Sequence, residues 1–262
     1  MRLDRAGRPV IGVQFNGQGP FDMVLDTAAQ SSVITAALAQ ELRLQPLPGE
    51  SISVQGVSGS AQVALYPVDE LKTDLFQAQF VALPGLPNAG STSARGILGV
   101  EHFAQGKLGF DHREGRLTFS ASSPVTAGSA AIQGRLDELG LLHVPLSIDG
   151  VAVDALVDTG ASTSVANWAV VAALGWRRDD PRLKAAGGIR GATQAVSSVM
   201  STHVDRFKIG PATLSNVPIL VTAPAGAREE KPHLILGIDL LAVLGTYAVD
   251  FPRAELQIGV PR

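Results

Sequence analysis

Apolar and polar residues alternate in one short stretch near the start of each half of the chain. The stretches VIGVQFNG (10–17) and HVPLSIDG (143–150) predict strands, and the dipeptides Asn16-Gly17 and Asp149-Gly150 that end them are typical of tight hairpin turns. In each half the next apolar run continues into an aspartate, in MVLDTAAQS (23–31) and ALVDTGAST (155–163). Aspartate is unfavourable in strands and costly to bury, so its position raises the question of its function.

The pattern that follows each aspartate is also similar in the two halves. Apolar residues at helical spacing predict helices in ITAALAQELRL (34–44) and VANWAVVAALGW (165–176). Glycine-rich stretches within 52–65 and 184–200 predict hairpins, and short helices are expected in VEHFAQG (100–106) and IDLLAVLG (238–245). Most of the remaining segments have the pattern of strands, so the chain is predicted to be all-β with short helices.

The two halves share five sequence landmarks in the same order, at a separation that grows from 132 to 139 residues. One shared tetrapeptide could arise by chance, but five in order indicate an internal duplication. The landmark pairs are Asp26-Thr27-Ala28-Ala29 with Asp158-Thr159-Gly160-Ala161, 56–59 with 188–191, 68–72 with 204–208, Ile97-Leu98-Gly99 with Ile235-Leu236-Gly237, and Asp111 and Leu117 with Asp250 and Leu256.

The domain division follows from this duplication. A small, polar, Gly- and Pro-containing stretch separates the two copies. We therefore expect an N-terminal lobe at 1–120, a linker at 121–134 and a C-terminal lobe at 135–262. The length of 262 residues also favours roughly two domains.

Composition excludes several classes of function. The net charge of -3 and the absence of a basic patch argue against nucleic acid or an anionic membrane as partner. The absence of cysteine excludes disulfides, cysteine nucleophiles and thiolate metal sites. The five histidines have no H-E-x-x-H or comparable spacing, so no metal site is expected, and both tryptophans are expected in the core. The first ten residues lack the apolar segment of a signal peptide, and no apolar run has the length of a membrane span.

Equivalent aspartates in two repeats suggest a specific chemistry. A pseudo-two-fold axis between the lobes would bring Asp26 and Asp158 together, and two carboxyl groups about 3 Å apart share one proton. The ionised carboxylate can then act as general base on a water molecule, while the protonated one polarises the carbonyl group of a peptide bond. This chemistry requires no metal, cofactor or covalent intermediate.

The paired Asp-Thr-Gly/Ala-Ala motif, a glycine-rich hairpin and a later Ile-Leu-Gly resemble the retropepsin-like aspartic proteases. Because the pattern occurs twice, the chain looks like a single-chain version of the retroviral homodimer, similar to exported bacterial aspartyl proteases. The resemblance implies two acid-protease β-barrel lobes, a dyad of Asp26 and Asp158, and a monomer with one active site. It also implies that Thr27 and Thr159 bond across the two active-site loops, and that Ala28 and Gly160 offer backbone groups to the dyad and the substrate.

The resemblance further implies two flaps that close over an extended peptide. The flap tips would consist of Gly56, Val57, Ser58, Gly59 and Ser60 in the first copy, and of Gly188, Ile189, Arg190, Gly191 and Ala192 in the second. The flaps lack the tyrosine found near the first flap tip of pepsins, so they match retropepsins better.

Two departures from the family pattern affect the expected activity. Ala28 replaces the usual glycine, which would cost roughly 1–2 kcal/mol if the position requires a positive φ. Ala29 and Ala161 stand where pepsins commonly have a hydroxyl that bonds to the ionised carboxylate. Its loss should raise the pKa values of the dyad, so activity is expected to extend toward neutral pH.

The sequence therefore predicts an aspartic endopeptidase that hydrolyses peptide or protein substrates in extended form. One alternative is a catalytically weak or inactive peptide-binding module with the same groove, which Ala28 would favour. The other is a structural protein, which the two retained aspartates argue against, since buried carboxylates without a role cost several kcal/mol. The resemblance favours the cell envelope or periplasm as the compartment.

Overall fold

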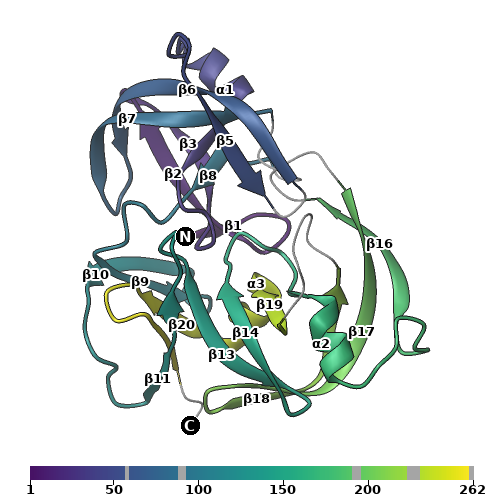
Figure 1. Ribbon diagram of the computed structural model, residues 1–262. Coiled ribbons are helices and arrows are strands. Elements are labelled where there is room, and N and C mark those ends of the chain that lie inside the picture. The colour runs from purple at the N-terminus through teal and green to yellow at the C-terminus, as the bar shows by residue number, and fades with distance from the viewer. Residues whose placement is uncertain (57–58, 88–92, 191–195, 223–230, 260–262) are drawn as a thin grey trace.

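The computed structural model describes residues 1–56, 59–87, 93–190, 196–222 and 231–259. These residues form three β-sheets and a few short helices, which confirms the predicted all-β class. Two sheets belong to separate lobes, and the third contains strands from both halves of the chain (Figure 1). No helix among these residues has the length and apolar character needed to cross a membrane.

The N-terminal lobe contains one large sheet of eight strands. Most neighbouring strands are antiparallel, but β3 pairs with β8 and β4 with β7 in parallel. In spatial order the strands are β1 (Arg2–Leu3), β2 (Pro9–Phe15), β3 (Gln18–Leu25), β8 (Gly96–Leu98), β4 (Val33–Thr35), β7 (Gln77–Leu86), β6 (Gly59–Lys72) and β5 (Ser51–Gly56).

The C-terminal lobe repeats this arrangement strand for strand, including the parallel pairs and an extra pairing of the second strand with the long one. This correspondence confirms the internal duplication. In spatial order the strands are β12 (Arg135–Leu136), β13 (Leu142–Ile148), β14 (Val151–Val157), β19 (His233–Leu236), β15 (Val165–Ala166), β18 (Ala212–Val221), β17 (Val196–Ile209) and β16 (Lys184–Arg190).

The third sheet joins the two halves of the chain. Its central contact is the antiparallel pair of β9 and β20, in which Phe110 lies opposite Tyr247. One edge strand, β11, lies inside the segment that the sequence assigned to a linker, and it pairs with β21. The division at 121–134 itself stays a prediction. In spatial order the strands are β10 (Arg116–Ala121), β9 (Gly106–Asp111), β20 (Thr246–Asp250), β21 (Glu255–Gly259) and β11 (Ser129–Gln133).

The helices are shorter than the sequence pattern suggested. The helix α1 (Ala36–Glu41) begins after Thr35, whose hydroxyl accepts a hydrogen bond from Leu38 N at 3.1 Å, and α2 (Trp168–Ala173) begins after Asn167 in the same way. The residues before Ala36 and before Asn167 belong to strands, so the spacing of apolar residues predicted helices that are longer than the observed ones. The helices α3 (Ile238–Leu241) and η1 (Ala242–Leu244) form where expected.

The helix expected in 100–106 is wrong. Phe103 N bonds to Val100 O at 2.8 Å and Gly106 N to Phe103 O at 3.0 Å, which gives two successive turns. Phe103 is fully buried between these turns, and Gly106 already begins β9. The chain therefore turns back toward the sheet before an α-helical bond can form.

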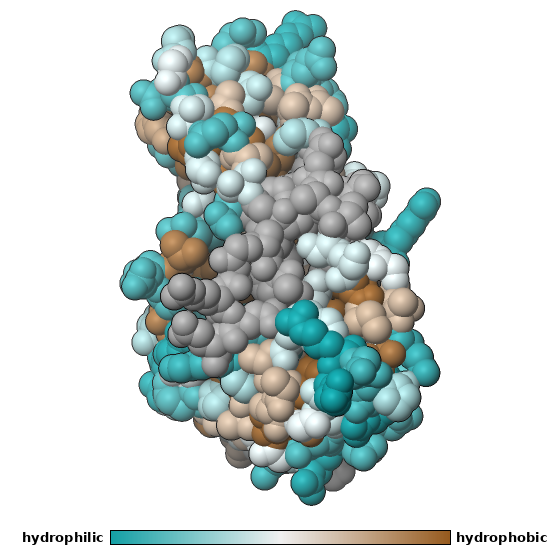
Figure 2. Space-filling model, turned by 45° about the vertical axis from the view of Figure 1, so that its right-hand side comes forward, coloured by the Kyte–Doolittle hydropathy of each residue, from teal (hydrophilic) through white to brown (hydrophobic). Residues whose placement is uncertain are grey.

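The main hydrophobic core extends through both lobes and the joining sheet. Strand β13 illustrates how alternating apolar residues contribute to this core. Its residues Leu142, Val144, Leu146 and Ile148 are buried, while the residues between them are more exposed. Each fully buried side chain of this size contributes about 1.5–3 kcal/mol of transfer free energy. On the described face in Figure 2, apolar residues occur in small areas interrupted by polar ones.

Candidate active site

The two aspartates follow equivalent strands in the two lobes. Asp26 comes directly after β3, and its N–H donates to Leu98 O at 3.0 Å; Asp158 comes directly after β14, and its N–H donates to Leu236 O at 3.0 Å. The parallel neighbours β8 and β19 contain the two Ile-Leu segments. Both expected Ile-Leu-Gly motifs therefore lie beside the active-site loops and fix where each strand ends.

Thr27 and Thr159 connect the two active-site loops through four reciprocal hydrogen bonds. Each threonine N–H donates to the hydroxyl of the other at 3.1 Å. The Thr27 hydroxyl donates to Val157 O, and the Thr159 hydroxyl to Leu25 O, both at 2.7 Å. Both residues are almost fully buried, at 1% and 0% exposure. This network joins residues 132 positions apart and brings the two aspartates to one place.

We expect Thr27→Val and Thr159→Val each to lower the free energy of unfolding by about 1–3 kcal/mol, because buried backbone groups lose their partners. Urea denaturation monitored by fluorescence measures the change. Thr213→Val is the matched control, since Thr213 is an exposed strand residue of β18. Unchanged unfolding midpoints in both active-site variants would contradict a structural role for the network.

The two carboxyl groups hydrogen-bond to each other and to the backbone of their own loops. Ala28 N donates to Asp26 Oδ1, and Ala161 N donates to Asp158 Oδ1, each at 2.8 Å. Asp158 is 8% exposed, and Asp26 is partly buried. The structure thus brings the two carboxyl groups together where the two active-site loops meet.

Burial is the main cause of the altered acidity of this pair. Loss of solvation raises the pKa of Asp26, although hydrogen bonds from Ala28 and Asp158 and the charge of Arg8 oppose the rise. Loss of solvation together with the nearby charge of Asp26 raises the pKa of Asp158 well above its usual value. The cause that the structure identifies is desolvation, and the effect expected from the missing hydroxyl groups at Ala29 and Ala161 stays a prediction.

The two positions after the threonines differ in the space around them. A Cβ at Gly160 would lie 2.3 Å from Asp26 Cγ, so only glycine fits there. In the other copy, Ala28 has no positive φ, so the backbone strain considered from sequence does not occur. Its N–H still reaches the dyad, and the substitution therefore preserves the hydrogen bond that the family glycine would make.

A further pair of interactions beneath the loops was not identified from the sequence. Ser32 Oγ accepts from Gly99 N at 3.0 Å, while its own N–H donates to Glu101 Oε1 at 2.7 Å. Ser164 repeats this arrangement in the second copy with Gly237 and Asp239. The sequence contains one signal of this arrangement, because an acidic residue, Glu101 or Asp239, follows Leu-Gly by two positions in both repeats.

The expected flaps are hairpins in the part of each that the structure describes. The first is formed by β5 and β6, with Gly56 opposite Gly59 and with Ser60 continuing β6. The second is formed by β16 and β17, with Gly188 opposite Ser198 and Ile189 opposite Ser197. Arg190 ends β16 opposite Val196. Val57, Ser58, Gly191 and Ala192 lie outside the described residues, and the role of the flaps in binding stays a prediction.

Three possible metal ligands lie together on the C-terminal lobe, a grouping that no local spacing in the sequence revealed. The ligand atoms of His143, Asp154 and His233 are within 4.8 Å of one another, on the neighbouring strands β13, β14 and β19. Asp154 already bonds to His143 Nδ1 at 3.0 Å and to the guanidinium of Arg135 at 2.6 Å. The positive charge of Arg135 opposes a cation at this position.

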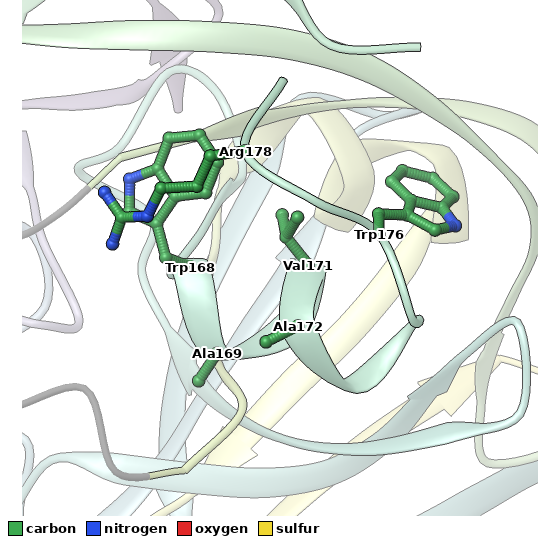
Figure 3. A pocket seen from close by; sticks show the side chains of 6 residues that line it. All are labelled: Trp168, Ala169, Val171, Ala172, Trp176 and Arg178. Atoms are coloured by element: carbon green, nitrogen blue, oxygen red, sulfur yellow. The ribbon is translucent and has the colours of Figure 1, made fainter. Parts of the chain in front are cut away.

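A separate open pocket of about 230 Å³ lies on α2 and the loop after it (Figure 3). The guanidinium of Arg178 stacks over Trp168, with 4.6 Å between its Cζ and the ring centroid. Trp168 and Trp176 are partly buried and pack against a buried apolar cluster, Trp176 also against the main core, so they lie at the edge of the core rather than inside it. Both pack against the buried residues Val171, Leu183 and Val221, and no carboxyl group lines the pocket.

Three comparisons with known proteins were made. A family model described as Aspartyl protease matches residues 11–102 and 144–240, one stretch in each copy. A search of curated proteins gave no significant match. Among solved structures, a retropepsin-like aspartic protease from Rickettsia conorii is similar at 19% identity, with a TM-score of 0.39, over 51% of this chain and all of that chain.

Proposed function

We propose that this chain, which belongs to the aspartyl protease family, is an endopeptidase that hydrolyses extended peptides with water activated between Asp26 and Asp158. The observation that supports the proposal most strongly is the contact of the two carboxyl groups beside the reciprocal threonine bonds. Few other roles explain why one buried and one partly buried carboxyl group are held together, since bringing two like charges together away from water is strongly unfavourable.

The reaction follows from one proton shared between two carboxyl groups. The ionised carboxylate removes a proton from water while the oxygen attacks the scissile carbonyl carbon, and the protonated carboxyl donates to the carbonyl oxygen. The resulting tetrahedral diol collapses as its C–N bond breaks, and the leaving nitrogen takes up the proton that the base removed from water. One hydroxyl group of the diol gives its proton to the carboxylate that protonated the carbonyl oxygen, so the dyad regains its starting state.

The substrate proposed for this site is a peptide or protein segment in extended conformation. Such a segment can form main-chain hydrogen bonds as an added strand, with alternate side chains in pockets. Both aspartates belong to the same chain, so one copy contains a complete dyad and we propose a monomer. The Ala28 N–H bond to Asp26 removes the main reason for the alternative of an inactive binding module.

The test is cleavage of a diverse peptide mixture between about pH 4 and pH 8, with products identified by mass spectrometry. We expect cleavage whose upper pH limit lies above that of an ordinary carboxyl group, because the pKa of Asp158 is raised. Activity is expected to fall at low pH as the base becomes protonated, and at high pH as Asp158 loses its proton. Binding of peptides without cleavage at any pH would contradict the proposal and favour the binding module.

A further inference from the structure

Arg8 of the N-terminal segment reaches the active-site loop of the other lobe. It lies in the loop between β1 and β2, and Figure 1 shows that the N-terminus, from which this segment begins, lies between the two lobes. Its Nη1 donates to Gly160 O at 3.4 Å, and its side chain is 11% exposed. The sequence pattern gave no indication of this contact, which spans 152 positions in the chain.

The orientation of this guanidinium is fixed by Asp4. Arg8 Nε and Nη2 donate to Asp4 Oδ2 at 2.9 and 2.7 Å, while Asp4 Oδ1 accepts from the N–H groups of Ala6 and Arg8. The Nε–Nη2 edge of the guanidinium therefore faces Asp4, and Nη1 is left to donate to the active-site loop. An ion pair with so little exposure is screened weakly by solvent.

The second repeat has the same turn without the positive charge. Asp137 Oδ1 accepts from the N–H groups of Leu139 and Leu141, as Asp4 Oδ1 does from Ala6 and Arg8. The residue equivalent to Arg8 is therefore Leu141, which is 6% exposed and belongs to the core. The turn of the first repeat thus presents a cation to the active-site loop, whereas the equivalent turn of the second repeat presents an apolar side chain.

The side that receives the cation is that of Asp26. Gly160, whose carbonyl binds Arg8, packs so closely on the Asp26 carboxyl group that a Cβ would lie 2.3 Å from its Cγ. We infer that Arg8 is a positioning residue that keeps the negative charge of the dyad on Asp26, so that Asp26 is the general base and Asp158 carries the proton. This inference rests on the proposed function and assigns different roles to two residues that the duplication makes equivalent.

Electrostatics agree with this assignment. The charged groups that the structure places near the guanidinium are Asp4 on its own loop and Asp26 of the dyad, and Arg8 does not act measurably on Asp158. The charge of Arg8 lowers the pKa of Asp26 against the larger, opposing effect of burial. The hydrogen bond between the carboxyl groups lowers the pKa of Asp26 and raises that of Asp158, as expected when Asp158 is the donor.

The test is a pH titration of the aspartate side-chain carboxyl carbons by 13C NMR in the wild type, Arg8→Gln, Arg8→Lys and Arg2→Gln. In the wild type we expect Asp26 to ionise first. In Arg8→Gln the lower of the two dyad pKa values should rise by about 1 unit, and Arg8→Lys should return it toward the wild type. Arg2→Gln removes an equal charge from an exposed ion pair with Asp22 and should not change the titration.

Two results would overturn the inference: a lower dyad pKa that is the same in Arg8→Gln and the wild type, or a wild type in which Asp158 ionises first. If Arg8→Gln, which removes the ion pair with Asp4, does not fold, Asp4→Asn/Arg8→Gln removes both charges of the pair and gives the same comparison. The acidic limb of the kcat/KM profile should move upward by the same amount. A wild type that cleaves no peptide would refute the proposed function, whereas the NMR titration would still decide the role of Arg8.

Discussion

Asp158→Asn is expected to lower kcat/KM for peptide cleavage by about 10³-fold or more, because the variant cannot supply the proton that polarises the scissile carbonyl. Asparagine retains the shape of the side chain, and its oxygen can still accept from Ala161 N as Asp158 does at 2.8 Å. Asp26→Asn should have an effect of similar size, since it removes the base. Single-turnover and steady-state cleavage of one peptide selected from the mixture measure the loss.

The stability of Asp158→Asn separates lost chemistry from lost structure. The pKa of Asp158 in the folded protein lies well above the ordinary value of 3.8, so its contribution to stability is present at low pH and is lost as pH rises through the folded pKa. Asparagine stays neutral throughout. We therefore expect the variant to unfold at the same or higher urea concentration than the wild type at neutral pH, with the difference disappearing near pH 3.

A matched control for this prediction is Asp22→Asn. Asp22 lies on β3, on the same strand that leads to Asp26, but it forms an exposed ion pair with Arg2. Exposed pairs contribute about 0–1 kcal/mol, so this variant should retain both stability and activity. Cleavage by Asp158→Asn at a rate near that of the wild type would contradict the dyad mechanism.

The sequence predicted those features that depend on local pattern or on the duplication. Asn16-Gly17 and Asp149-Gly150 both have positive φ in the structure, as the hairpin assignment required. The equivalence of the two copies led directly to the pairing of Asp26 with Asp158. In both cases a short motif was sufficient. Few residue types adopt the positive φ of these hairpin turns, and few arrangements other than a shared proton accommodate two adjacent carboxyl groups.

The features that could not be predicted depend on contacts between distant segments. The Arg8 bond to Gly160 and the grouping of His143 with Asp154 and His233 join residues that no short motif connects. Periodicity also failed where a cap or a turn competed with it, as at Thr35 and around Phe103. Tertiary packing decided these positions, and a single sequence contains only weak signals of it.

Gly160→Ala is expected to reduce kcat/KM by about 10²-fold, although it adds only one methyl group. The new Cβ would lie 2.3 Å from both Cγ and Oδ2 of Asp26, a distance that real Cβ atoms do not adopt, so the carboxyl group must move. Displacement of a reacting group by about 1 Å can reduce a rate by this factor. Steady-state kinetics on the same peptide measure the effect.

The control for crowding alone is Gly109→Ala in the joining sheet. Its Cβ would lie 2.6 Å from Thr118 Oγ1, which is also too short for a real Cβ contact, and Thr118 belongs to no proposed site. This variant should retain activity, and Ala28→Gly, which gives the first copy the glycine of the second, should not reduce it. If Gly160→Ala and Gly109→Ala cleaved at similar rates, the position of the Asp26 carboxyl group would not control the reaction. If only Gly160→Ala lost activity while remaining folded, the close contact between the two loops would be part of the catalytic geometry. The motif would then require glycine because a side chain does not fit beside Asp26, and not because the backbone adopts a positive φ.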